Sequence, residues 1–172
     1  MVNIILIGFM GCGKSTVGRI LAAETGAPLV DTDHFIEKQM GKTVSAIFES
    51  YGEAFFRQAE TDCLRELLNG SEAGQIISVG GGLPMKEENR QMMKQLGKVC
   101  YLKTALPVIM ARLQGDCSRP LLAQEQPAKR AEELLTVRHP VYEAAADIII
   151  DTSDQDPQAI AQSILSVLCV TT

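Results

Sequence analysis

The sequence predicts a doubly wound α/β fold, in which helices cover both faces of a parallel sheet. Five short segments rich in Ile and Val have the apolar character of strands that are buried on both sides: residues 3–7, 28–31, 75–79, 98–102 and 147–151. Longer segments with helical periodicity alternate with them, and this alternation is typical of right-handed crossovers between parallel strands. Since no repeat or linker divides the 172 residues, we expect a single domain.

Two of the helices have recognisable ends near the start of the chain. The first is expected over residues 14–25, because Gly26 is a common helix stop. Asp33 is placed to cap a second helix that runs to Met40.

The rest of the chain contains further helices and one irregular segment. Residues 43–50 and 54–69 have helical periodicity. Pro107 and Pro157 each stand where a helix begins, since proline has a fixed φ and no amide hydrogen. Residues 115–126 are polar and lack clean periodicity, which indicates a mobile surface loop.

The composition excludes several classes of protein. Hydrophobic residues make up 46% and charged residues 22% of the chain, the balance of a soluble globular protein. The net charge is -5 without a basic stripe, which argues against nucleic-acid or membrane partners. The five cysteines contain no Cys-x-x-Cys pair, so neither a disulfide framework nor a zinc site is indicated. We expect a monomeric, cytoplasmic protein whose cysteines are reduced.

The strongest motif is Gly-Phe-Met-Gly-Cys-Gly-Lys-Ser at residues 8–15, which matches the phosphate-binding loop of nucleotide-binding proteins. An apolar strand precedes it and a helix follows, whereas a plain glycine-rich turn is the alternative. Backbone amides and the helix N-terminus attract phosphate, Lys14 can bridge the β- and γ-phosphates, and Ser15 can bind Mg²⁺. The ATP contacts predicted in this loop and directly after it are Gly11, Cys12, Gly13, Lys14, Ser15 and Thr16.

A pair of carboxylates follows the second strand, at the edge of the sheet where ligands gather. Asp31 and Asp33 are one residue apart. One can orient Mg²⁺ through its water shell, while the other accepts hydrogen bonds from a substrate hydroxyl. For Asp33, helix capping alone is the alternative.

Arg57 and the glycines that follow the third strand are candidates for binding an anionic substrate. Arg57 lies three residues before Glu60 on one helix, so a structural ion pair is the default interpretation. Because Arg57 follows two phenylalanines, its guanidinium is also suited to a bidentate grip on a carboxylate. Gly80, Gly81 and Gly82 permit a close approach of the backbone to a ligand, or form a plain flexible loop.

Two more arginines lie in short motifs of the second half. Arg119 precedes Pro-Leu-Leu in the expected loop, where it could swing onto a transferring phosphate or remain solvated. Arg138 precedes His-Pro, and its alternative role is that of a cation at a helix end.

Taken together, these motifs resemble the shikimate kinase family, in the nucleoside-monophosphate-kinase-like branch of phosphate-loop proteins. The resemblance covers essentially the whole chain. It rests on the phosphate loop together with Asp-Thr-Asp, Phe-Arg with Glu three residues on, Gly-Gly-Gly, Arg-Pro-Leu-Leu and Arg-His-Pro-x-Tyr.

The resemblance implies a fold and a reaction. The fold is a three-layer α/β/α arrangement with the strand order 2-3-1-4-5, a substrate-binding region near residues 32–60 and a lid near 112–124. The reaction is transfer of the γ-phosphate of ATP to the 3-hydroxyl of shikimate, with Mg²⁺ as cofactor.

The resemblance also implies roles for individual residues. Asp33 would hold the ring hydroxyls of shikimate, as proton acceptor or as positioner, and Arg57 and Arg138 would bind its carboxylate. Gly80, Gly81 and Gly82 would line the same pocket, and Asp31 and Ser15 would position Mg²⁺. Lys14 and Arg119 would contact the phosphates, and Arg112 and Pro157 would contact the adenine. Lys14, Asp33 and Arg119 are the expected catalytic residues.

Three other functions match the motifs of this sequence less well. A gluconate kinase of the same branch would act on a linear acid, whereas Arg57, Arg138 and the three glycines favour a cyclic one. A nucleotide kinase would need to select a second base, and nothing obvious does so. A signalling GTPase would carry Asn-Lys-x-Asp, which does not occur here.

Overall fold

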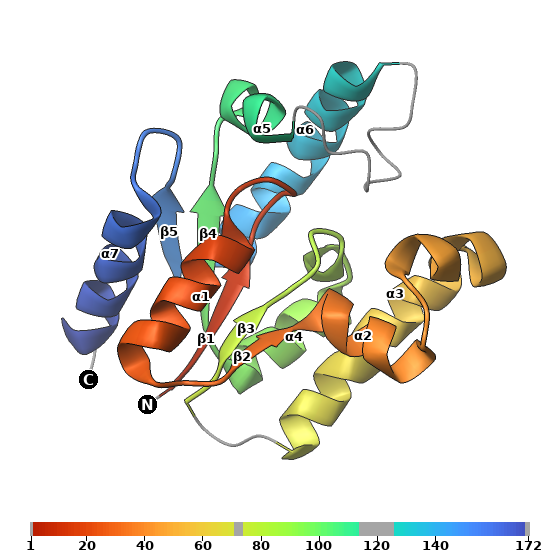
Figure 1. Ribbon diagram of the computed structural model, residues 1–172, viewed down its shortest axis with the longest axis horizontal. Helices are drawn as coiled ribbons and strands as arrows, with labels where there is room; N and C mark the ends of the chain where they lie inside the picture. The colour runs from red at the N-terminus through yellow and green to blue at the C-terminus, as the bar shows by residue number, and fades with distance from the viewer. Residues whose placement is uncertain (1, 71–73, 114–125, 171–172) are drawn as a thin grey trace.

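The computed structural model describes residues 2–70, 74–113 and 126–170, in which a parallel sheet lies between two layers of helices (Figure 1). Its strand order is β2-β3-β1-β4-β5. Both the five predicted strands and the order implied by the family resemblance are confirmed, with strand ends that shift by one residue. The strands are β1 (Asn3–Ile7), β2 (Leu29–Asp31), β3 (Ile76–Ser78), β4 (Gly97–Lys103) and β5 (Ile148–Asp151).

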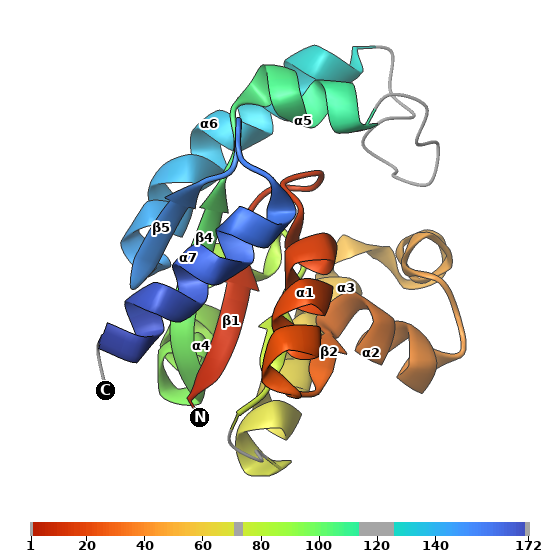
Figure 2. The same cartoon turned by 60° about the vertical axis from the view of Figure 1, so that its left-hand side comes forward.

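Helices α1 (Lys14–Thr25) and α7 (Pro157–Val170) cover one face of the sheet (Figure 2). Ile4 and Leu6 of β1 pack into this layer with Leu21 and Ile164. As predicted, α1 ends at Gly26, which adopts the left-handed conformation with φ 71°. Because side chains alternate along a strand, the neighbouring residues of β1 point to the opposite face.

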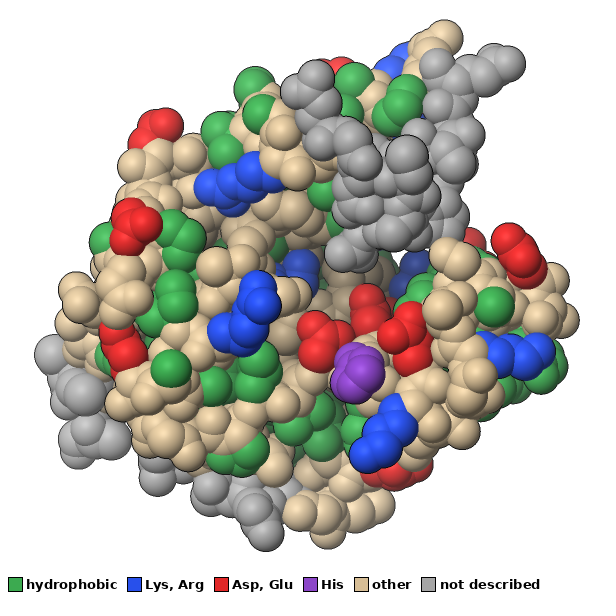
Figure 3. All heavy atoms as spheres, in the orientation of Figure 1, with side chains coloured by type: hydrophobic (Ala, Val, Ile, Leu, Met, Phe, Trp, Pro, Cys, Tyr) green, Lys and Arg blue, Asp and Glu red, His purple; other side chains and the backbone are tan. Residues whose placement is uncertain are grey.

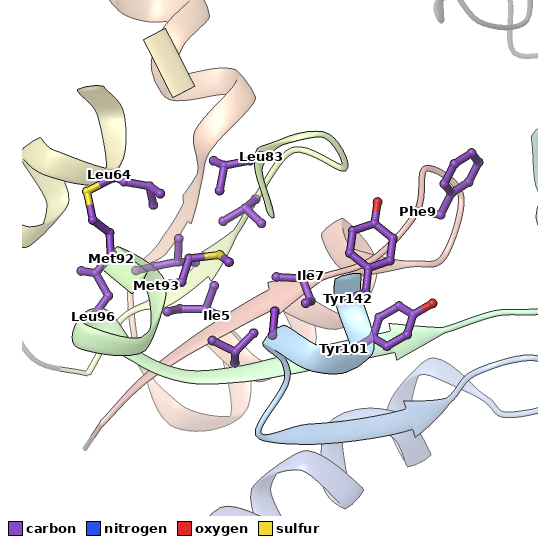
Figure 4. Packing of buried hydrophobic residues seen from close by; sticks show 14 of the residues in the cluster. Ile5, Ile7, Phe9, Leu64, Leu83, Met92, Met93, Leu96, Tyr101 and Tyr142 are labelled. Carbon is purple, nitrogen blue, oxygen red and sulfur yellow. The ribbon is translucent and has the colours of Figure 1, made fainter. Parts of the chain in front are cut away.

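The opposite face of the sheet is covered by α4 (Glu87–Leu96) and α6 (Pro127–Ala145), two helices whose bounds the sequence did not reveal. Ile5 and Ile7 of β1 pack here against methionines and leucines, and against Tyr101 and Tyr142 (Figure 4). A sheet buried on both faces explains why its strands read as uninterrupted apolar segments.

Three further helices lie at the carboxyl ends of the strands or beyond the edge of β2, as Figure 1 shows: α2 (Thr32–Met40), α3 (Val44–Gly70) and α5 (Leu106–Leu113). The short 3₁₀ helix η1 (Leu83–Met85) follows β3. Gly52, with φ 80°, interrupts α3. This break separates the two helical segments that the sequence predicts over 43–50 and 54–69. Ile36 of α2 packs against Ile47 and Phe56 of α3 in a separate small core.

The prediction that Asp33 caps α2 is wrong. The helix begins at Thr32, and Oδ1 of Asp31 accepts hydrogen bonds from the amides of Asp33, at 3.0 Å, and His34, at 3.2 Å. Asp31 ends β2 in an extended conformation, so its carboxylate reaches over the first turn. Asp33 therefore lies inside that turn.

Two further expectations concern the ends of elements. Pro107 is the second residue of α5, and Pro157 is the first of α7. Of the expected loop 115–126, only Gln126 lies within the described residues, where it precedes α6. Across the described part of the chain, no helix has both the length and the apolar character needed to cross a bilayer.

Candidate functional site

The carboxyl ends of β1, β2 and β3 face a cavity of about 1370 Å³. Figure 3 shows acidic side chains gathered beside the hollow on this face of the molecule. Arg119 lies outside the described residues. All other predicted site residues line the cavity, namely Gly11, Cys12, Gly13, Lys14, Ser15, Thr16, Asp31, Asp33, Arg57, Gly80, Gly81, Gly82, Arg112, Arg138 and Pro157.

The phosphate loop, residues 8–15, turns from β1 into α1 through glycines in conformations that other residues rarely adopt. Gly11 has φ 75° and Gly13, directly before α1, has φ 100°. The Lys14 ammonium donates hydrogen bonds to the carbonyls of Gly8, at 2.8 Å, and Phe9, at 3.1 Å. A cation and a helix N-terminus thus share one end of the cavity, which is an arrangement that binds anions.

Arg112 of α5 connects the phosphate loop to the loop that follows β5, at the rim of the cavity. Its guanidinium donates to the carbonyls of Gly11, at 3.4 Å, and Thr152, at 3.1 Å. Thr152 is fully buried and shares a hydrogen bond of 2.5 Å with Thr104. Sequence reasoning missed this support, because an isolated threonine carries no positional signal. Pro157 starts α7 beside the same loop.

At the other end of the cavity, Arg57 is both an ion-pair partner and a wall residue. Its Nη1 lies 2.8 Å from Oε2 of Glu60, and its Nη2 lies 3.1 Å from Oε1 of Glu53. The guanidinium also lies against the rings of Phe48 and Phe56, 5.9 and 5.7 Å from their centroids. The expected apolar surroundings of Arg57 are therefore present together with the ion pair.

Glu60 is a functional candidate whose burial the sequence did not reveal. Its side chain is 1% exposed, and among the described residues its Oε1 has no hydrogen-bond partner. Burial raises the pKa of Glu60 to about 7, although the charge of Arg57 acts in the opposite direction. The spacing from Arg57 indicated the pair, but the exposure of a helix face depends on what packs against it.

The three glycines after β3, Gly80–82, serve close packing rather than an unusual backbone conformation, since none has a positive φ. A Cβ on Gly82 would lie 2.2 Å from Nη1 of Arg57. A Cβ on Gly80 would lie 2.6 Å from Oδ1 of Asp33 and 2.8 Å from Oε1 of Glu60. Glycine thus lets this backbone segment contact the charged side chains of α2 and α3.

Arg138 comes from the middle of α6, so its interpretation as a cation at a helix end is wrong. The guanidinium carbon lies 5.7 Å from the ring centroid of Phe9 in the phosphate loop. Leu134 and Arg130 precede Arg138 by one and two turns and also line the cavity. Sequence reasoning missed both, although their spacing of four and eight residues from Arg138 could have indicated them.

Comparison with known proteins connects this geometry to a family. The family model described as Shikimate kinase matches residues 10–169. The chain belongs to the shikimate kinase family. A shikimate kinase of Chromohalobacter salexigens is 42% identical over 163 residues, which are 95% of this chain and 89% of that protein. A shikimate kinase of Thioalkalivibrio sulfidiphilus is 43% identical over 94% of this chain and 84% of its own length.

Solved structures of shikimate kinases share the fold. The Acinetobacter baumannii enzyme in complex with shikimate superposes with a TM-score of 0.94 at 38% identity, covering 100% of this chain and 95% of its own. The Aquifex aeolicus enzyme has a TM-score of 0.82 at 32% identity, with 99% and 98% coverage. The family and the fold inferred from the sequence are confirmed.

Proposed function

We propose that this member of the shikimate kinase family transfers the γ-phosphoryl group of ATP to the 3-hydroxyl of shikimate. One observation carries the proposal: a single cavity is lined by Lys14 at the phosphate loop and by Arg57 on α3, and the guanidinium of Arg138 lies against Phe9 of that loop and near Gly81. Two anionic substrates can occupy such a cavity with their reacting groups between the two ends. Phosphoryl transfer depends mainly on this kind of positioning and on charge stabilisation.

The nucleotide is assigned to the phosphate-loop end. Amides of the loop and the ammonium of Lys14 would hold the phosphates, once Lys14 exchanges its carbonyl partners for phosphate oxygens. Arg112 and Pro157 would border the adenine. Arg119 is assigned to the transferring phosphate on the family resemblance.

Ser15 and Asp31 are the residues that would hold Mg²⁺, and both line the cavity. A hydroxyl and a carboxylate are oxygen ligands of the kind that Mg²⁺ prefers, and two backbone amides fix the carboxylate of Asp31. The described residues contain no group of three or more potential metal-ligating His, Cys, Asp or Glu. An ion that arrives with ATP needs no such group, since phosphate and water supply its other ligands. When bound, it neutralises phosphate charge.

The ring acid is assigned to the far end of the cavity. Arg57 and Arg138 would bind its carboxylate, while Asp33 accepts hydrogen bonds from its hydroxyls and Gly80–82 provide the adjacent wall. Asp33 can act as proton acceptor or as positioner, because the reaction does not require a strong base.

A coupled assay of ADP release tests the assignment across shikimate, quinate, gluconate and nucleoside monophosphates with Mg-ATP. We expect shikimate to be the preferred acceptor. The Lys14→Ala variant, purified identically, measures any contaminating kinase. Faster turnover of gluconate or of a nucleotide would contradict the proposal. A monomeric state and a cytoplasmic location stay predictions from the sequence.

A further inference from the structure

Tyr142 belongs to the Arg-His-Pro-x-Tyr motif, yet the proposed function gives it no role. It follows Arg138 by four residues on α6, so the two side chains lie on the same face of the helix. Its side chain is completely buried in the core beneath the cavity. Tyr142 nevertheless ends in a polar group, and a buried hydroxyl needs partners.

The hydroxyl of Tyr142 bonds to the glycine segment and lies near a charged residue of the cavity wall, Arg138. It donates a hydrogen bond to the carbonyl of Gly81, at 2.5 Å. Because a phenol has a single proton, its oxygen can then only accept a further hydrogen bond, and the neighbouring donor is the Arg138 guanidinium, whose charge and N–H groups act to lower the pKa of Tyr142. Burial raises the pKa of Tyr142 to about 12, so the proton stays in place at neutral pH.

The three groups meet at one point. A Cβ placed on Gly81 would lie 3.5 Å from both Nη1 of Arg138 and the hydroxyl oxygen of Tyr142. On another side, the Arg138 guanidinium lies against the ring of Phe9. A neutral hydroxyl and an aromatic ring orient this arginine without adding an anion that would compete with a bound carboxylate.

We propose that Tyr142 is a positioning residue, whose hydroxyl holds the Arg138 guanidinium and the Gly81 carbonyl in the arrangement that binds the carboxylate end of the acceptor. The inference rests on the proposed function, since it assumes that Arg138 binds the acid. It adds a residue that acts through Arg138 and does not itself reach the substrate.

The test is Tyr142→Phe, which removes the hydroxyl and keeps the ring. Tyr101→Phe is the matched control, since its ring lies 5.1 Å away in the same core and its hydroxyl bonds instead to Nδ1 of His139 (Figure 4). We expect Tyr142→Phe to raise KM for shikimate about tenfold, the effect of losing a hydrogen bond to a charged group. The KM for ATP and the midpoint of thermal unfolding should match those of the control.

A double-mutant cycle with Arg138→Lys identifies the route of the effect. In the Arg138→Lys background, Tyr142→Phe should raise KM for shikimate by less than about twofold, because the guanidinium that it orients is already gone. Three outcomes would each overturn the inference. The two tyrosine variants could have equal KM values for shikimate, the effects in the cycle could be additive, or KM for ATP could rise in parallel. If the wild type itself does not turn over shikimate, the proposed function fails first and the inference falls with it.

Discussion

The two ends of the cavity are built in different ways. The phosphate loop and the start of α1 at the phosphate end belong to one continuous strand–loop–helix unit, residues 3–25, which Arg112 and Asp31 border, and many of the loop's expected contacts are backbone groups. The acid end combines Asp33 of α2, Arg57 of α3, the glycines after β3 and Arg138 of α6. Recognition of phosphate can therefore be encoded locally, whereas recognition of the ring acid requires four distant segments to meet.

The cations at the two ends also have different partners. Lys14 is bonded to backbone carbonyls, which carry no net charge. Arg57 is bonded to two carboxylates, the exposed one of Glu53 and the buried one of Glu60. The acid end should therefore respond to pH and to small changes in packing, and the phosphate end mainly to loss of its lysine.

The largest effect is expected at the phosphate end. Lys14→Ala should lower kcat by about a thousandfold or more, because the transferring phosphate loses its cation. The coupled ADP-release assay measures this loss. Lys38→Ala, an exposed lysine on α2, is the control and should retain normal turnover. Near-normal activity of Lys14→Ala would remove the assigned role.

At the acid end, Arg57→Ala should raise KM for shikimate about a hundredfold and leave KM for ATP nearly unchanged. Steady-state kinetics with each substrate varied in turn separate the two constants. Arg65→Ala is the matched control on the same helix, because Arg65 pairs with Asp62 and Glu88 at the surface. A larger change in KM for ATP would assign Arg57 to the nucleotide end.

The buried carboxyl of Glu60 should make stability depend on pH. The ordinary pKa of 4.5 applies to the unfolded chain, and burial raises it to about 7 in the fold. As the pH rises from about 4.5 to about 7, the unfolded chain loses this proton first, so the contribution of protonated Glu60 to stability is lost. Relative to Glu60→Gln, the wild type should therefore lose free energy of unfolding across this range.

Urea unfolding of both proteins at pH 4.5, 6 and 8 measures the difference. Glu53→Gln is the control, because Glu53 contacts the same arginine from an exposed position. Wild-type and Glu60→Gln curves that stay parallel across the range would contradict the raised pKa.

The smallest effect is expected for a methyl group added beside Arg57. Gly82 has φ -88°, so alanine fits its backbone, but the added Cβ would displace the guanidinium. We expect KM for shikimate to rise by about threefold to tenfold, with little loss of stability because the arginine end can move. Gly70→Ala, where a Cβ meets nothing within 4 Å, should change neither quantity.

The elements that the sequence predicted well are those whose signal is local. Strands buried on both faces carry uninterrupted apolar segments, and the phosphate loop contains its own glycines, lysine and helix start. The cap of α2 was assigned to Asp33, whereas the structure gives this role to Asp31, two residues earlier. Only the path of the backbone out of β2 selects between them.

The sequence alone therefore determined the strands and their order along the chain, the phosphate loop and the family resemblance, since each depends on neighbouring residues or on motif order. Tertiary structure decided that Glu60 is buried, that glycines 80 and 82 contact charged side chains, and that Tyr142 bonds to Gly81 near the guanidinium of Arg138. The physical reason is that burial and long-range hydrogen bonds depend on which elements pack together, and residue spacing along the chain does not specify that packing.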